Sequence, residues 1–202
     1  MSVSFTEEMK GFYAPGAPAY DTGYVTGQRD WNRLMFHLTI TTDDVRAMTR
    51  DPRHRMRAEG FVRCRELGAA DLPVHDGSFD LFAPSPAPGR LQMGYCLPVQ
   101  SNRGPMTLLG FKDVGNDGGI DVWADTTTLF TRLVPGTGDP DRLLEHRDDE
   151  HARGILRLDA PMFARQLTTV RGPAAEVARF GAFFTARLLA VYARRPTTEV
   201  VP

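Results

Sequence analysis

Residues 90–99 (RLQMGYCLPV), 101–105 (SNRGP) and 106–114 (MTLLGFKDV) decide the fold class of this chain. The first and last of these segments are short, rich in apolar residues and typical of β-strands. The middle segment holds Asn-Arg-Gly-Pro, which is typical of a tight turn. Two strands joined by so short a connection predict an antiparallel hairpin.

The same alternation of strand and breaker continues along the chain. Further strands are expected at residues 33–41, 60–67, 77–83, 122–134 and 154–158, which makes roughly seven in all. Breakers rich in Pro or Gly stand at 84–89 and 115–119, and a short helix is expected between the cap residues 42–44 and Pro52. This order predicts a mainly β protein, an antiparallel meander that closes as a β-barrel, with a sandwich as the alternative.

The two ends of the chain differ from the strand region. Residues 1–31 combine Gly, Pro and aromatic residues without a sustained period, so we expect an irregular arm over the body and leave open whether it is a lid. Residues 173–194 predict a C-terminal amphipathic helix, with apolar residues at three- and four-residue steps at Val177, Phe180, Phe184, Leu188 and Val191. We expect residues 1–202 to form a single domain.

Composition excludes several partners. The formal net charge is −1, so no overall field draws the chain to nucleic acid or to an anionic membrane. The first ten residues carry acids and no apolar run of signal-peptide length, so we expect a cytoplasmic protein. Cys64 and Cys96 lack metal or redox spacing, so we expect both to be buried free thiols. The sequence leaves a homodimer open.

The common cofactor motifs are missing from the sequence. No GxGxxG, GxxxxGK[ST], GxSxG or HExxH pattern occurs, so we expect no bound cofactor and no metal. The acidic cluster at residues 148–151 is typical of a solvated loop.

Four residues are candidates for acid, base or hydrogen-bond donor roles. Lys112 is one of two lysines and could donate to a substrate carbonyl, or it could be an outward charge that protects a sheet edge. Tyr95 shares a face with Met93 and needs a hydrogen-bond partner if it is buried. His37 faces away from its apolar neighbours, either into a polar cavity or to solvent.

Asp80 is the fourth candidate. It stands between Phe79 and Leu81, so its carboxylate must face water or find a donor. The structural alternative is an ion pair with Arg63, Arg65 or Lys112.

The segment 121–132 (DVWADTTTLFTR) mixes polar and apolar residues on both faces of a predicted strand. The interior of a barrel that holds a ligand would tolerate this mixture. We therefore expect Trp123, Phe130, Thr127 and Met93 to contact a substrate, although an exposed threonine-rich strand or an ordinary core would give the same pattern.

Three segments carry a resemblance to a known type of protein: residues 5–11 (FTEEMKG), 34–40 (LMFHLTI) and 123–129 (WADTTTL). Together they resemble an accessory β-rich domain associated with cholesterol-oxidase-like flavoprotein fusions of high-GC bacteria, without the flavin-binding part. The resemblance implies a large apolar ligand, sterol-like or polyketide-like, and transfers no catalytic residue.

Three hypotheses follow. The first is a cofactor-independent enzyme of secondary metabolism that binds a large apolar substrate in a barrel cavity and promotes intramolecular cyclisation, including cycloaddition, or isomerisation. The second is a non-catalytic module that binds a sterol-like or polyketide-like ligand beside a separate oxidoreductase. A barrel with a filled core and only a structural role is the third.

Overall fold

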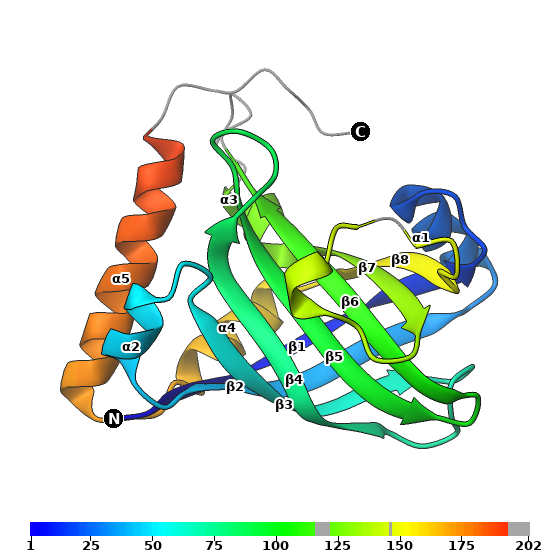
Figure 1. Cartoon of the computed structure of the whole chain (residues 1–202), viewed down its shortest axis with the longest axis horizontal. Helices are drawn as coiled ribbons and strands as arrows, with labels where there is room; N and C mark the ends of the chain where they lie inside the picture. The colour runs from blue at the N-terminus through cyan, green and yellow to red at the C-terminus, as the bar shows by residue number, and fades with distance from the viewer. Residues whose placement is uncertain (116–121, 146, 194–202) are drawn as a thin grey trace.

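The computed structural model describes residues 1–115, 122–145 and 147–193. Eight antiparallel strands form a closed barrel in sequence order, with β1 paired to both β2 and β8 (Figure 1). The strands are β1 (Val3–Pro15), β2 (Arg33–Thr42), β3 (Arg55–Cys64), β4 (Leu72–Pro84), β5 (Leu91–Ser101), β6 (Gly104–Val114), β7 (Thr128–Pro135) and β8 (Ala152–Arg157). The predicted antiparallel β-barrel is confirmed.

Five α-helices lie among the described residues, more than the sequence predicted. They are α1 (Tyr20–Arg29), α2 (Val45–Arg50), α3 (Val122–Thr127), α4 (Ala160–Thr168) and α5 (Ala174–Tyr192), and a short 3₁₀ turn η1 covers Pro140–Arg142. The predicted C-terminal helix is confirmed as α5, although residue 194 lies outside the described part. None of the described helices is long and apolar enough to cross a membrane.

The prediction of an irregular arm at residues 1–31 is wrong. β1 alternates buried and partly exposed residues from Val3 to Met9, and this strand closes the barrel. α1 then lies against the outer wall near β1 and β8, at the end of the barrel away from α5 (Figure 1). Two glycines allow this close approach, because a Cβ at Gly27 would meet the Tyr13 carbonyl oxygen at 2.1 Å, and one at Gly23 would meet the Arg153 carbonyl oxygen at 2.2 Å.

Other boundaries also differ from prediction, and β4 begins at Leu72, five residues before the predicted start at residue 77. The strand expected at 122–134 begins only at Thr128, because residues 122–127 form α3, in which the Thr127 hydroxyl donates to the Trp123 carbonyl oxygen as helical threonines do. β3 begins five residues before the predicted start at residue 60, since a register irregularity between Ala58 and Gly60 interrupts its pattern. The predicted breaker at 115–119 lies mostly outside the described residues.

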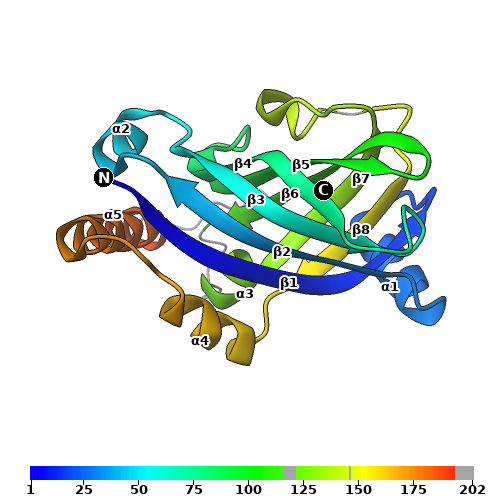
Figure 2. The same ribbon diagram turned by 90° about the horizontal axis from the view of Figure 1, so that it is seen from below.

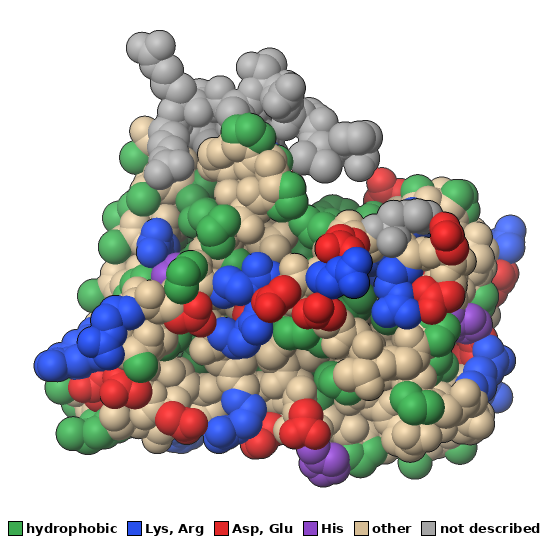
Figure 3. All heavy atoms as spheres, in the orientation of Figure 1, with side chains coloured by type: hydrophobic (Ala, Val, Ile, Leu, Met, Phe, Trp, Pro, Cys, Tyr) green, Lys and Arg blue, Asp and Glu red, His purple; other side chains and the backbone are tan. Residues whose placement is uncertain are grey.

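The helices α4 and α5 lie at one end of the barrel. Figure 2 shows α4 beside β1, and this contact includes a hydrogen bond from the Thr6 amide to the Thr169 hydroxyl at 2.8 Å. α5 lies next to α2 and crosses that same end (Figure 1). Acidic and basic side chains mix over the face seen in Figure 3.

The interior of the barrel is apolar over most of its length. Met9, Leu34, Phe36, Leu97 and Leu108 are all at most 1% exposed and fill the half nearer α1. Outside the barrel, a smaller apolar cluster of Cys96, Leu109, Val134 and Leu143 lies beneath the segment that follows β7. Both cysteines are buried and free, as predicted.

Candidate functional site

A cavity of about 420 Å³ lies inside the barrel at the end covered by α4 and α5. This volume is within the range of small-molecule sites. Leu167, which is 60% exposed, lies at its rim, so the cavity reaches the surface. Its walls are mostly apolar and come from strands and helices: Phe5, Glu7, Phe79, Leu81, Met93, Tyr95, Lys112, Thr126, Leu158, Phe163, Gln166, Leu167, Val170, Val177, Phe180, Gly181, Phe184 and Thr185.

Three polar side chains meet in the wall of this cavity. Glu7 points inward from β1 because it lies on the same face of the strand as the buried residues Phe5 and Met9. Its Oε1 accepts a hydrogen bond from Lys112 Nζ of β6 at 2.6 Å, and its Oε2 accepts one from the Tyr95 hydroxyl of β5 at 2.7 Å. We call Glu7, Tyr95 and Lys112 the polar triad.

The polar triad is almost completely removed from solvent. The side chains of Glu7 and Lys112 are 2% and 3% exposed, and Tyr95 is 1% exposed. Burial, followed by the neighbouring Glu7 carboxylate, raises the pKa of Tyr95 well above its usual value. Tyr95 therefore stays protonated at neutral pH and donates to Glu7, so it is a poor base.

Lys112 keeps hydrogen-bonding capacity for a ligand. An ammonium has three N–H donors, and within the described part of the chain Glu7 is its one hydrogen-bond partner. The Lys112 nitrogen also lies 5.4 Å from the centre of the Tyr95 ring. It can thus donate to a carbonyl oxygen in the cavity while still paired with Glu7.

Of the predicted catalytic residues, Lys112 and Tyr95 lie together at the cavity, and Met93 of the predicted contact residues lies beside them. His37 does not: its side chain is 37% exposed on the outer face of β2. There its Nδ1 lies 3.2 Å from Glu8 Oε2, and its ring stacks on Phe61 with centroids 5.6 Å apart. The solvent-facing alternative given for His37 is the one observed.

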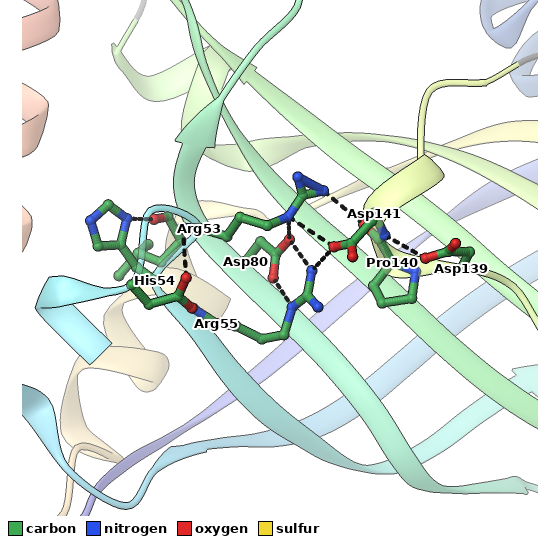
Figure 4. Close-up of polar contacts among 9 residues, drawn as sticks. Arg53, His54, Arg55, Asp80, Asp139, Pro140 and Asp141 are labelled. Carbon is green, nitrogen blue, oxygen red and sulfur yellow. Dashed lines mark hydrogen bonds and ion pairs between the residues drawn. The ribbon is translucent and has the colours of Figure 1, made fainter. Parts of the chain in front are cut away.

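Asp80 is also outside the barrel, where it is buried beneath η1 (Figure 4). Its Oδ2 lies 2.9 Å from Arg53 Nε and its Oδ1 lies 2.7 Å from Arg55 Nε. Arg55 also reaches Asp141 at 2.6 Å, and Arg53 donates to the Pro140 carbonyl oxygen at 3.0 Å. Asp80 therefore holds η1 against the barrel through an ion pair, with Arg53 and Arg55 as partners in place of those the sequence suggested.

The predicted contact residues of segment 121–132 lie around the cavity and not in it. Trp123 is 47% exposed and its ring makes an edge contact with Phe163, whose centroid is 5.4 Å away. Phe130 lies on the outer face of β7, where its ring contacts Phe111 and Tyr20 at 5.3 and 5.4 Å. Thr127 is buried without lining the cavity, and Thr126 lines it instead.

α5 is held over the cavity by a buried histidine. His54 Nδ1 lies 2.7 Å from the Leu81 carbonyl oxygen, so this nitrogen carries the proton and donates. His54 Nε2 is then an acceptor, 3.1 Å from Arg187 Nη2 of α5, and Phe183 of α5 lies against the ring at 4.8 Å. Burial is the main cause that lowers the pKa of His54, so the neutral form is the one that joins α5 to the barrel.

A larger depression of about 1030 Å³ lies at the other end, between Trp31 and Arg65. Two of its basic side chains are at the surface: those of Lys10 and Arg63 are 56% and 57% exposed and pair with Glu8 and Asp71. Such groups bind ligands weakly because they remain solvated. The cavity under α5 is therefore the stronger candidate.

Glu7, Gly181 and the α4 residues are the functional candidates that sequence reasoning missed. The alternation of Val3, Phe5 and Met9 was the signal that could have placed Glu7 inside a barrel. Among the described residues, no group of three or more His, Cys, Asp or Glu side chains is arranged to hold a metal ion.

No protein-family model matches this chain, and no curated protein and no solved structure is significantly similar to it. The resemblance to an accessory domain of cholesterol-oxidase-like fusions stays a prediction from the sequence.

Proposed function

We propose that this protein is a cofactor-independent enzyme that binds a largely apolar small molecule in the cavity under α5 and promotes its intramolecular cyclisation or isomerisation. The observation that carries the proposal is the polar triad: a buried carboxylate, ammonium and phenol converge at one end of an apolar cavity. A polyketide-like or related compound of secondary metabolism has the required size and polarity.

Lys112 has the central role in both reactions. Its ammonium donates to the carbonyl oxygen of the substrate and stabilises negative charge that develops there. In a cycloaddition, this hydrogen bond polarises the alkene conjugated to the carbonyl. The cavity holds the chain folded so that its diene reaches that alkene, and two C–C bonds form with no atom lost.

In an isomerisation, Glu7 is the proposed base. Its carboxylate accepts a proton from the carbon next to the carbonyl, the C–H electron pair forms a new C=C bond, and the oxyanion accepts from Lys112. The same proton then returns to the substrate two carbons further along, which moves the double bond. Tyr95 positions the carboxylate by donating to its Oε2.

The resemblance noted above favours the alternative, a non-catalytic module that holds a sterol-like or polyketide-like ligand for a separate oxidoreductase. Such a module needs the cavity but not the triad, so the two functions differ in how they depend on Lys112. His37 and Asp80 enter neither proposal because they lie outside the barrel.

Two probes test the proposal. One is a linear trienone that carries a diene and an enone on one chain, and the other is a β,γ-unsaturated steroid ketone. Binding is measured by native mass spectrometry and products by chromatography. A product of unchanged mass and altered retention, lost in Lys112→Met and kept in the surface control His37→Ala, supports the enzyme.

Binding of both probes without any product supports the accessory module. Failure of the wild-type protein to bind either probe refutes a ligand-binding cavity. Gly181→Leu serves as a second control, because Gly181 lines the cavity without belonging to the polar triad, and a larger side chain there should narrow the cavity.

A further inference from the structure

The charges that line the cavity cancel. Among its described lining residues only Glu7 and Lys112 are charged, and they are paired at 2.6 Å. The other polar side chains of the lining are uncharged: Tyr95 on β5, and Thr126, Gln166 and Thr185 on the helical wall. A ligand that enters therefore meets a site with no net charge.

Three arginines on elements around the cavity are engaged outside it. Arg187 of α5 is directed to His54, and Arg53 and Arg55 hold Asp80 on the outer wall. None of the three lines the cavity. A buried anionic ligand would thus find no cation of its own, and it would lie near the Glu7 carboxylate.

A buried charge without a partner is strongly unfavourable, whereas a carbonyl or ester oxygen needs only a hydrogen-bond donor. Lys112 offers such donors, since its ammonium has two N–H groups beyond the one directed to Glu7. An uncharged ligand can therefore use Lys112 without separating it from Glu7.

We infer that the cavity selects uncharged ligands that carry a carbonyl group, such as ketones, esters and lactones, and discriminates against free carboxylates of the same length. This inference rests on the proposed function, because it specifies the substrate class of the same site. Glu7 is the residue that sets this preference.

The test compares methyl dodecanoate with dodecanoate, which have the same acyl chain and differ in charge. Dissociation constants are measured by calorimetry at a pH of about 8, where a carboxyl group is ionised. We expect the wild-type protein to bind the ester roughly ten-fold more tightly or better. In Glu7→Gln, Lys112 has no counter-ion, so we expect the preference to shift toward dodecanoate by a similar factor.

Each outcome separates the inference from the proposed function. Equal or tighter binding of dodecanoate by the wild-type protein overturns the inference and leaves a ligand-binding cavity in place. Failure of both compounds to bind, or binding that persists unchanged in Gly181→Leu, overturns the cavity itself. The wild-type comparison needs no variant, so the inference stays testable even if Glu7→Gln fails to fold, and His37→Ala should keep the wild-type preference.

Discussion

Replacing Lys112 with Met should destabilise the protein strongly, because it leaves the Glu7 carboxylate buried with only Tyr95 as a donor. Methionine keeps an unbranched side chain of similar length and removes the charge. Breaking a buried ion pair by removing one partner costs about 3–5 kcal/mol of unfolding free energy. For a chain of 202 residues each kcal/mol shifts the melting temperature by about 2–4 °C, so we expect a fall of about 6–20 °C.

A double-mutant cycle separates the pair from its surroundings. The double variant Glu7→Gln/Lys112→Met buries no charge at this position, so its loss of stability should be well below the sum of the two single losses. Urea unfolding followed by circular dichroism gives all four free energies. Single losses below about 1 kcal/mol that simply add would refute the reasoning, because they are the behaviour of a solvated pair.

Three further predictions concern residues outside the polar triad. Gly181→Ala should raise the unfolding free energy by about 0.5–1 kcal/mol, since alanine favours the helix and the added Cβ meets no atom within 4 Å. Burial lowers the pKa of His54 in the folded protein, so the stabilising effect of neutral His54 is complete above pH ~6.5 and is lost as the pH falls from there through the lowered pKa. The unfolding free energy should change by at most about 1.4 kcal/mol per pH unit in this range. Urea unfolding of His54→Asn should show a flatter pH dependence. Asp80→Asn should lower the unfolding free energy by about 1–3 kcal/mol in the same assay, because its partners Arg53 and Arg55 are part-exposed. This variant should bind methyl dodecanoate like the wild type. If Asp80 were catalytic, the variant would lose turnover and keep its stability.

The barrel could be predicted from the sequence because most of its strands are local patterns. Short alternating segments separated by Pro and Gly specify an antiparallel meander without any knowledge of distant contacts. β1 was missed because one of its inward positions is Glu7, and a charged residue at a core position breaks the pattern that identifies a strand. The same residue that completes the site thus concealed the strand that closes the fold.

The site could be predicted only in part, for a reason of geometry. Alternation in β5 and β6 places Tyr95 and Lys112 on the inward face, and both were identified. Their partner Glu7 is 88 residues from Tyr95 and 105 from Lys112, so it meets them only when the barrel closes. His37 and Asp80 alternate with inward-facing residues and therefore point outward. The sequence alone does not say which of the two faces of a strand is the buried one, so it could not place these two side chains.

The position of the polar triad along the barrel argues for a ligand. A barrel of eight strands has an interior that side chains can just fill, as Met9, Phe36 and Leu108 do in the half nearer α1. The other half keeps a cavity, and the charged pair lies where the filled half ends. Apolar side chains of similar volume would stabilise that position as well as an ion pair or better, so stability alone does not account for Glu7 and Lys112. The proposed substrate carbonyl, which needs a donor in an otherwise apolar cavity, would account for them.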